Sequence, residues 1–190
     1  MLDKSIPYFD VLMKREKGTQ IKNYKLPEGF EFVLFKNGDE KEWAEIEASV
    51  GEFNTAADAL AYFSKNFLPY IDELERRCIF IRNDQGEKVA TLTIWWRYTG
   101  VRRVPWLHWV AVKPEYQGLG LGKAIVSEGM KRFIEIEGDR DIYLHTQTWS
   151  YKAINIYRKL GFEITAEKGI GGYENNNYEK AMALLAKYLR

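Results

Sequence analysis

The stretch "VAVKPEYQGLGLGKAIVSEGMKRF", residues 110–133, carries the most informative pattern in the chain. An apolar run ends at a proline, three glycines alternate through 118–122, and an amphipathic stretch follows at once. This order predicts a strand, a glycine-rich turn and a helix over 121–137. Successive N–H groups at the positive end of a helix suit a phosphate or pyrophosphate. We therefore predict an anion site at Gln117 to Lys123; a turn that needs glycine only for its geometry is the alternative.

The composition fits one domain with a sizeable core. The 190 residues are 46% hydrophobic and 15% aromatic, and 28 basic residues nearly balance 27 acidic ones. This balance argues against a nucleic-acid or membrane partner, and no apolar run approaches the roughly 20 residues that cross a bilayer. The start of the chain lacks the apolar core of a signal peptide, so we expect a cytoplasmic protein.

The sequence predicts neither an intrachain disulfide nor a metal site. The single cysteine, Cys78, cannot form an intrachain disulfide and is interpreted as a small buried residue. Two histidines and one cysteine at these separations give no metal site.

The pattern around the glycines predicts a mixed sheet. Strands are expected at 30–35, 78–82, 88–97, 104–112, 141–147 and 162–165, and helices near 39–48, 56–67, 69–76, 121–137 and 151–160. This order is typical of an α/β class protein, here an α+β mixed and mostly antiparallel sheet flanked by helices. For 180–188 we favour a final strand over a helix. Residues 1–28 are expected to be an N-terminal extension, with one candidate strand near 8–13, before a domain at 29–190.

Two familiar phosphate loops fail on spacing. The dinucleotide pattern G-x-G-x-x-G meets Lys123 or Ile125 where its last glycine belongs. The nucleoside-triphosphate loop G-x-x-x-x-G-K-S/T meets Gln117 and Ala124 at two required positions.

A third pattern fits. Gln117-x-x-Gly120-x-Gly122, after a strand that ends in Val-Ala-Val, resembles the acyl-coenzyme A loop Q/R-x-x-G-x-G/A of the GNAT superfamily of N-acetyltransferases. Farther along, residues 150–162 resemble that family's segment N-x-x-A-x-x-L-Y-x-x-x-G-F, with agreement at Ala153, Tyr157, Gly161 and Phe162. Ser150 departs, because the family often has asparagine there; a helix-capping role survives the change.

The resemblance implies acetyl-CoA (coenzyme A) as donor, an amine of a small molecule or peptide as acceptor, and often a homodimer, for which the expected last strand is a candidate contact. The cofactor-binding residues that follow from it are Val110, Ala111, Val112, Gln117, Gly118, Leu119, Gly120, Leu121, Gly122, Lys123 and Ser150. The strand would pair with the pantetheine arm, and the loop would hold the pyrophosphate. A catalytically silent sensor that binds an acyl-coenzyme A through the same loop is the alternative from another class.

Two residues are candidates for catalysis. Tyr157 matches the family tyrosine that protonates the departing thiolate; a core tyrosine is the alternative. His108 lies in a strand that resembles that of serotonin N-acetyltransferase, with a histidine four residues before the last valine. It is the candidate base; a base acting through water, or a histidine merely bonded in the sheet, is the alternative. Period two would place His108, Val110 and Val112 on one face.

Other side chains near these strands are less specific. His145 could line the acceptor pocket, although packing is the simpler interpretation. Some of the five tryptophans in the region are expected to be core and others to favour a cationic or ring-bearing amine; they are Trp95, Trp96, Trp106, Trp109 and Trp149.

Overall fold

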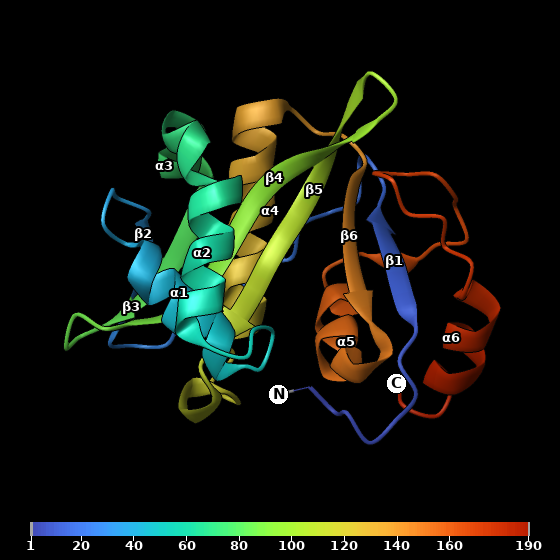
Figure 1. The fold of residues 1–190 in the computed structure, drawn as a ribbon, viewed down its shortest axis with the longest axis horizontal. Helices are drawn as coiled ribbons and strands as arrows, with labels where there is room; N and C mark the ends of the chain where they lie inside the picture. Colours follow the sequence, from blue (N-terminus) through green and yellow to red (C-terminus); the bar gives the residue numbers. More distant parts are fainter. Residues whose placement is uncertain (1, 190) are drawn as a thin grey trace. The chain divides into compact units, whose positions relative to one another are not determined.

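The computed structural model describes residues 2–189 and shows a mixed sheet flanked by helices (Figure 1). The strands are β1 (Asp10–Arg15), β2 (Phe30–Leu34), β3 (Cys78–Asn83), β4 (Lys88–Thr99), β5 (Arg102–Val112), β6 (Ile142–Gln147) and β7 (Glu163–Ile164). The α-helices are α1 (Glu40–Ser49), α2 (Ala56–Asn66), α3 (Ile71–Arg77), α4 (Leu121–Glu137), α5 (Tyr151–Lys159) and α6 (Tyr178–Leu185). Short 3-10 turns are η1 (Leu68–Tyr70), η2 (Pro114–Tyr116) and η3 (Thr148–Ser150).

The sheet order is β2-β3-β4-β5-β6-β1-β7. The pairs β2–β3, β3–β4, β1–β6 and β1–β7 are antiparallel, whereas β5 and β6 run parallel. The prediction of a mixed, mostly antiparallel sheet is therefore confirmed.

The chain divides into two compact units. The first unit holds 23–93 and 109–132, and the second holds 2–22, 94–108 and 133–190. Two strands, β4 and β5, and the helix α4 each contribute residues to both units.

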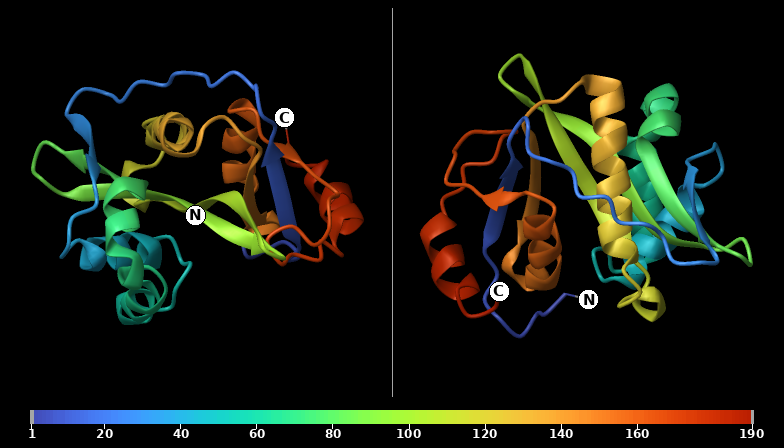
Figure 2. Two further views of the ribbon diagram at one scale, coloured as in Figure 1. Left: turned by 90° about the horizontal axis from the view of Figure 1, so that it is seen from above. Right: turned by 180° about the vertical axis from the view of Figure 1, so that it is seen from behind.

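In the first unit, helices cover both faces of the strands. Figure 2 shows α4 on one face of β3 and β4, and α1 and α2 on the other. Leu92 of β4 packs directly below Gly129 of α4, where a Cβ would come within 2.6 Å of a leucine methyl group. The opposite face is filled by rings: Phe35 lies 5.6 Å from Phe63 of α2 and 6.4 Å from Phe80 of β3, centroid to centroid. These buried rings account for much of the aromatic composition.

The start of α2 follows the sequence rule for helix caps. Thr55 has extended backbone dihedrals, and its hydroxyl accepts a hydrogen bond from the N–H of Asp58 at 3.1 Å.

In the second unit, the N-terminal strand lies inside the sheet. β1 pairs with β6 over six residues and with β7 over two. Figure 2 shows α5 and α6 on opposite sides of β1. The expectation of a strand near 8–13 is confirmed with a shift of two residues.

The strand expected at 180–188 is wrong, because this segment forms α6. Ala181 and Leu185 are buried four residues apart, which is the spacing of one helix face. The apolar run AMALLA satisfies both periods in a short window, and packing against β1 selects the helix. The predicted dimer contact was assigned to this strand, so the helix removes the reason for that prediction.

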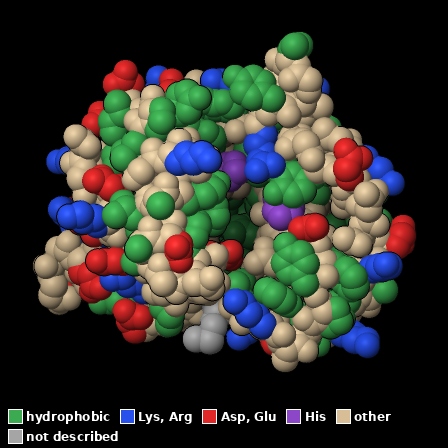
Figure 3. All heavy atoms as spheres, in the orientation of Figure 1, with side chains coloured by type: hydrophobic (Ala, Val, Ile, Leu, Met, Phe, Trp, Pro, Cys, Tyr) green, Lys and Arg blue, Asp and Glu red, His purple; other side chains and the backbone are tan. Residues whose placement is uncertain are grey.

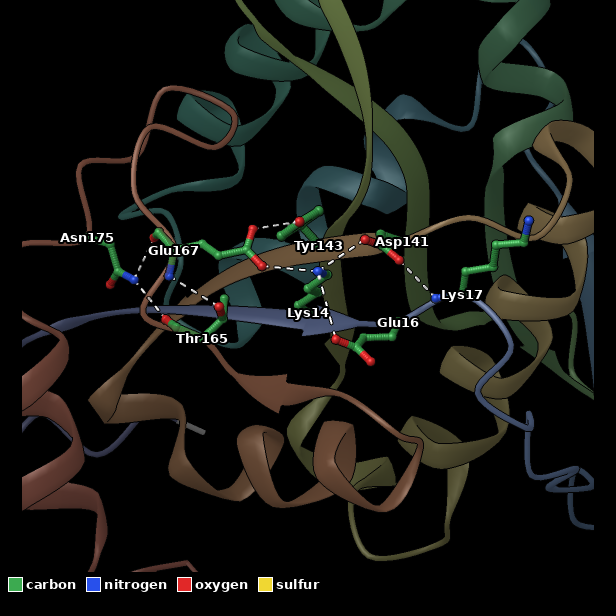
Figure 4. Close-up of polar contacts among 8 residues, drawn as sticks. All are labelled: Lys14, Glu16, Lys17, Asp141, Tyr143, Thr165, Glu167 and Asn175. Carbon is green, nitrogen blue, oxygen red and sulfur yellow. Dashed lines mark hydrogen bonds and ion pairs between the residues drawn. The ribbon is translucent and has the colours of Figure 1, made fainter.

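A polar network fixes the segment after β7 to the second unit (Figure 4). Lys14 Nζ of β1 lies 3.0 Å from Glu167 Oε1 and 3.1 Å from Asp141 Oδ2. Tyr143 Oη donates to the other oxygen of Glu167 at 2.8 Å, and Asn175 donates to the Glu167 carbonyl oxygen at 2.9 Å. The hydrogen bond to Glu167 is the main cause that raises the pKa of Lys14, and burial raises the pKa of Tyr143 to about 12.

We predict that Glu167→Ala lowers the melting temperature by a few degrees, because two charge-assisted or phenolic hydrogen bonds worth about 1 kcal/mol each are lost. Thermal unfolding followed by circular dichroism measures this. Glu174→Ala removes an exposed carboxylate from the same segment and serves as the control. Equal melting temperatures for the two variants would show that the network does not contribute to stability.

Candidate functional site

The glycine-rich turn between β5 and α4 has the geometry that the sequence predicts. Gly118 and Gly120 have φ values of 88° and 87°, a region that favours glycine. Residues 117–120 are exposed, and a Cβ built on either glycine would meet no atom within 4 Å. The glycines are therefore required for the backbone path and not to avoid a neighbouring atom.

The N–H groups of this turn form a run. Within residues 2–189, no hydrogen bond occupies the N–H groups of 118–122. The run is shorter than predicted at both ends: Gln117 N–H donates to Pro114 O at 3.2 Å, and Lys123 N–H donates to Gly120 O at 3.1 Å. Left-handed glycines that alternate with other residues aim such groups toward one side, a backbone pattern that suits an anion at the start of a helix.

The side chains at the ends of the turn hold it in place. Gln117 Nε2 donates to Val112 O at 2.9 Å, which ties the turn to the last residue of β5. Lys123 Nζ lies 5.7 Å from the centre of the Tyr24 ring in a cation–π contact. A cationic side chain in the first turn of a helix is unfavourable to the helix dipole, and a bound anion would offset that cost.

The strand that precedes the turn is distorted at Trp109. This residue has φ 50°, which is strained for a bulky side chain. A positive φ at Trp109 interrupts the regular pleat between His108 and Val110. The residues of β5 that pair with β6 are Trp106 and Leu107. Val110 to Val112 come after these paired residues in the chain.

The second motif lies on α5 in the second unit. Tyr157 is 7% exposed, and its ring makes an edge contact with Phe162 at 6.1 Å. Gly161, at φ 89°, ends the helix region as predicted. Ser150 occupies the N-cap position of α5 as predicted. Its side chain makes no capping hydrogen bond, so the predicted capping interaction is wrong.

His108 lies near Arg97, His145 and the ring of Trp106. The residue is half-buried, and its ring lies 6.2 Å from Trp106, centroid to centroid. Burial is the main cause that lowers its pKa to about 3, and the charges of Arg97 and His145 lower it further. Arg97 is held over the rings of Trp106 and Tyr173, at 5.4 and 4.8 Å. His108 is therefore neutral at physiological pH and a weak base.

The other histidine, His145, lies within hydrogen-bond distance of a carboxylate. His145 Nε2 lies 2.9 Å from Asp10 Oδ1, and its ring stacks on Tyr173 at 3.9 Å. Burial lowers the pKa of His145, while the hydrogen bond to Asp10 opposes that shift. Both histidines, purple in Figure 3, are visible from outside, so each could contact a ligand.

The five tryptophans singled out in the sequence do not share one role. Trp106 is core, and Trp95 is buried against Trp96 with stacked rings 4.3 Å apart. Trp149 donates its Nε1–H to Ile6 O at 2.7 Å. Trp109 alone of the five belongs to the first unit.

A comparison with known sequence families identifies the family. Residues 32–162, more than half of the chain, match the model of the Acetyltransferase (GNAT) family. The chain belongs to the GNAT family.

Among curated GNAT relatives, two illustrate the range of similarity. The N-alpha-acetyltransferase of Sulfurisphaera tokodaii is 31% identical over 105 residues, covering 51% of this chain and 62% of that protein. The spermidine N(1)-acetyltransferase of Escherichia coli K12 is 30% identical over 113 residues, covering 60% of this chain and 59% of that protein. The chain thus spans about three fifths of the length of these relatives.

Solved GNAT structures share the fold. A GCN5-related N-acetyltransferase from Sphaerobacter thermophilus matches with a TM-score of 0.66 at 19% identity, over 82% of this chain and 48% of that one. A tandem GNAT protein from the clavulanic acid biosynthesis pathway matches with a TM-score of 0.62 at 15% identity, over 86% and 52%.

The sequence analysis missed one group in this GNAT domain. In the first unit, the rings of Trp43, Phe53, Tyr62 and Trp109 contact one another, and Glu47 is buried one helical turn after Trp43. The only sequence signal is the four-residue spacing of Trp43 and Glu47, which places a carboxyl on the apolar face of α1. Glutamate is seldom fully buried without a partner, so this residue is a functional candidate.

Three other features bear on what the chain can bind. Within the described range 2–189, no set of three or more His, Cys, Asp and Glu side chains could hold a metal ion. In the same range, no helix combines the length and apolarity that crossing a membrane requires. Cys78 is buried as expected, and burial raises the pKa of its thiol to about 12, which makes it unreactive.

We predict that the His108 ring does not titrate near its usual pKa. Its ring-proton NMR shifts should stay constant from pH ~8 to pH ~5, because the folded-state pKa lies far below the free value. Since the folded state binds fewer protons than the unfolded state between these pKa values, His108 contributes stability above pH ~6.5 that is lost as the pH falls. His108→Gln identifies the resonance. A titration midpoint near 6.5 would contradict the prediction.

Proposed function

We propose that this chain is an N-acetyltransferase that moves an acetyl group from acetyl-CoA to a primary amine of a small molecule or peptide. The observation that carries the proposal is the run of N–H groups at 118–122, which have no partner within the described residues and lie at the start of α4 in a GNAT domain. Five such donors at a helix N-terminus fit a pyrophosphate. When bound, acetyl-CoA supplies an acetyl thioester on an extended pantetheine arm.

The residues around the turn support binding of the same donor. Lys123 adds a positive charge beside the proposed pyrophosphate site. Val110, Ala111 and Val112 carry main-chain amides beyond the register with β6, and an extended arm with amides of its own can pair with such an edge. An N–H of this strand would also stabilise the oxyanion that develops during acyl transfer.

The relatives support an amine as acceptor. One is named an N-alpha-acetyltransferase and another a spermidine N(1)-acetyltransferase. The acceptors implied by these names are all amines, although they differ in size and charge. The class of reaction is thus better supported than any single acceptor.

Two side chains would move protons. An alkyl amine is mostly protonated at neutral pH and must lose a proton before it attacks. His108 is the candidate acceptor of that proton, but a pKa of about 3 makes it weakly basic, which favours transfer through water over direct abstraction. Tyr157 is the candidate donor to the departing sulfur through its phenol Oη.

The proposal is tested by measuring thiol release from acetyl-CoA with a broad panel of primary amines. Steady release that depends on the amine is the expected result. Binding of acetyl-CoA without turnover of any amine would instead indicate a protein that senses the coenzyme.

We predict that Gly120→Glu abolishes acetyl-CoA binding, because a carboxylate enters the proposed phosphate site and a left-handed glycine is lost. Isothermal titration calorimetry measures the affinity. Gly86→Glu is a matched control, since Gly86 also has φ 87°, is exposed and would have no atom within 4 Å of an added Cβ. It carries the same backbone strain at a site outside 117–123. Unchanged affinity in Gly120→Glu would refute the assignment of the loop.

We predict that Tyr157→Phe lowers kcat roughly tenfold or more, while acetyl-CoA affinity is nearly unchanged. The phenylalanine ring retains the edge contact with Phe162, so the loss reports the hydroxyl group. Steady-state kinetics measure the effect. Tyr151→Phe removes a hydroxyl from the same helix as a control. If Tyr157→Phe and the parent protein have equal rates, Tyr157 is a core residue only.

A further inference from the structure

Glu47 of α1 is an acid buried in the first unit. The residue is 1% exposed, and within residues 2–189 no hydrogen bond reaches its Oε1 atom. Burial raises its pKa well above 4.5, and the carboxylate of Glu52 raises it further. A buried carboxylate is costly unless a cation or hydrogen-bond donors compensate it. The site therefore accommodates either a proton or a positively charged ligand.

Glu47 lies beside a group of aromatic rings. Trp43 precedes it by one helical turn on the same buried face of α1. The carbonyl oxygen of Glu47 accepts the N–H of Glu52 at 3.3 Å, which brings the next residue, Phe53, alongside. The aromatic cluster consists of Trp43, Phe53, Tyr62 and Trp109.

The aromatic cluster is closely packed but reaches the surface. Its ring centroids are separated by 6.0 Å (Trp43–Phe53), 5.6 Å (Trp43–Trp109), 5.2 Å (Phe53–Trp109), 5.5 Å (Phe53–Tyr62) and 5.2 Å (Tyr62–Trp109). Trp43 is fully buried, whereas the other three residues are partly exposed. The faces of Trp and Tyr rings attract cations, most strongly where water is excluded.

Two further buried polar atoms belong to the cluster. They are the Nε1–H groups of Trp43 and Trp109, and neither has a hydrogen-bond partner in the described part of the chain. Buried donors of this kind usually bind an acceptor atom. An ammonium can satisfy the Glu47 carboxyl but not these two donors, so they mark an incompletely satisfied polar site and do not identify its ligand.

We propose that Glu47 and the aromatic cluster bind an ammonium group of the acceptor, and that the acceptor carries a second amine, which is the one acetylated. The inference rests on the proposed function and specifies its substrate class, a diamine or polyamine. Glu47 forms the ion pair, and the exposed ring faces surround the methylene groups and the charge.

The need for a second amine follows from the chemistry of nitrogen. An ammonium held by Glu47 has no lone pair and cannot attack a carbonyl carbon. The other amine, after losing a proton, uses its lone pair to form the N–C bond as the C–S bond breaks. The nitrogen then loses its remaining extra proton, and the sulfur leaves as a thiolate that takes up a proton. One acceptor nitrogen is thus bound through its charge while another reacts.

The proposal is tested with three acceptors of similar length: 1,4-diaminobutane, 1-aminobutane and 4-amino-1-butanol. The parent protein should have a kcat/KM for the diamine roughly tenfold or more above that for either monoamine, as expected for a charge-assisted hydrogen bond. Glu47→Gln should remove this preference by raising KM for the diamine, with the monoamines nearly unaffected. Phe53→Leu should weaken diamine binding by about threefold through loss of ring contact.

Glu45→Gln is the matched control, because Glu45 is an exposed glutamate on the same helix. It should retain the preference for the diamine. Melting temperatures establish that the variants are folded; an amide has nearly the shape of the protonated Glu47 side chain. Equal diamine-to-monoamine ratios in the parent protein and Glu47→Gln would overturn the proposal, as would a parent protein that does not prefer the diamine.

A separate binding measurement distinguishes this inference from the proposed function. Quenching of tryptophan fluorescence by 1,4-diaminobutane is measured without acetyl-CoA in the parent protein and in Glu47→Gln. Only two of the six tryptophans lie in the aromatic cluster, so the difference between the two proteins is the readout. If no amine is acetylated but the diamine binds the parent protein more tightly than Glu47→Gln, the proposed function fails and the ammonium site stands. If monoamines and diamines are acetylated equally and the diamine binds both proteins alike, the function stands and the ammonium site fails.

Discussion

The backbone path of the turn before α4 governs the candidate donor site. Gly118 and Gly120 adopt positive φ, and this path leaves the N–H groups of 118–122 without partners among the described residues. A chain tolerates such donors where water or an anion can reach them, and residues 118–120 of the turn are exposed. The hydrogen bond from the Gln117 side chain to Val112 O ties the turn to the end of β5.

The positive φ of Trp109 shapes β5 just before the turn. Trp109 adopts a positive φ without being glycine, so its strain must be offset by contacts of the ring. Those contacts are with Trp43, Phe53 and Tyr62, and they fix the path of β5 immediately before Val110. The aromatic cluster therefore has a structural role in shaping the strand and, with Glu47, presents a chemistry suited to a cation.

Electrostatics separate the two proton-transfer candidates. Burial and the charges of Arg97 and His145 keep His108 neutral, so it is available to accept a hydrogen bond but holds a proton weakly. Tyr157 occupies the position that the family motif predicts, and its burial, with an edge contact to Phe162, fits both a core residue and a positioned donor. Glu47 contrasts with His108, because the same burial that weakens a base makes a carboxyl hold its proton or seek a cation.

Features that depend on neighbouring residues could be predicted from the amino-acid sequence. The spacing of nearby residues predicts the turn at 118–122, the capped α2, the helix α4 and the family motif. Glycine dihedrals, capping hydroxyls and helix periodicity all act over a few residues. Other features arose only when distant segments packed together. Packing on β1 made 178–185 a helix, the first unit brought Trp43 of α1 beside rings from α2 and β5, and the lowered pKa of His108 came from burial and from charges distant in sequence. Burial and long-range charge depend on which segments meet, and no local pattern specifies that.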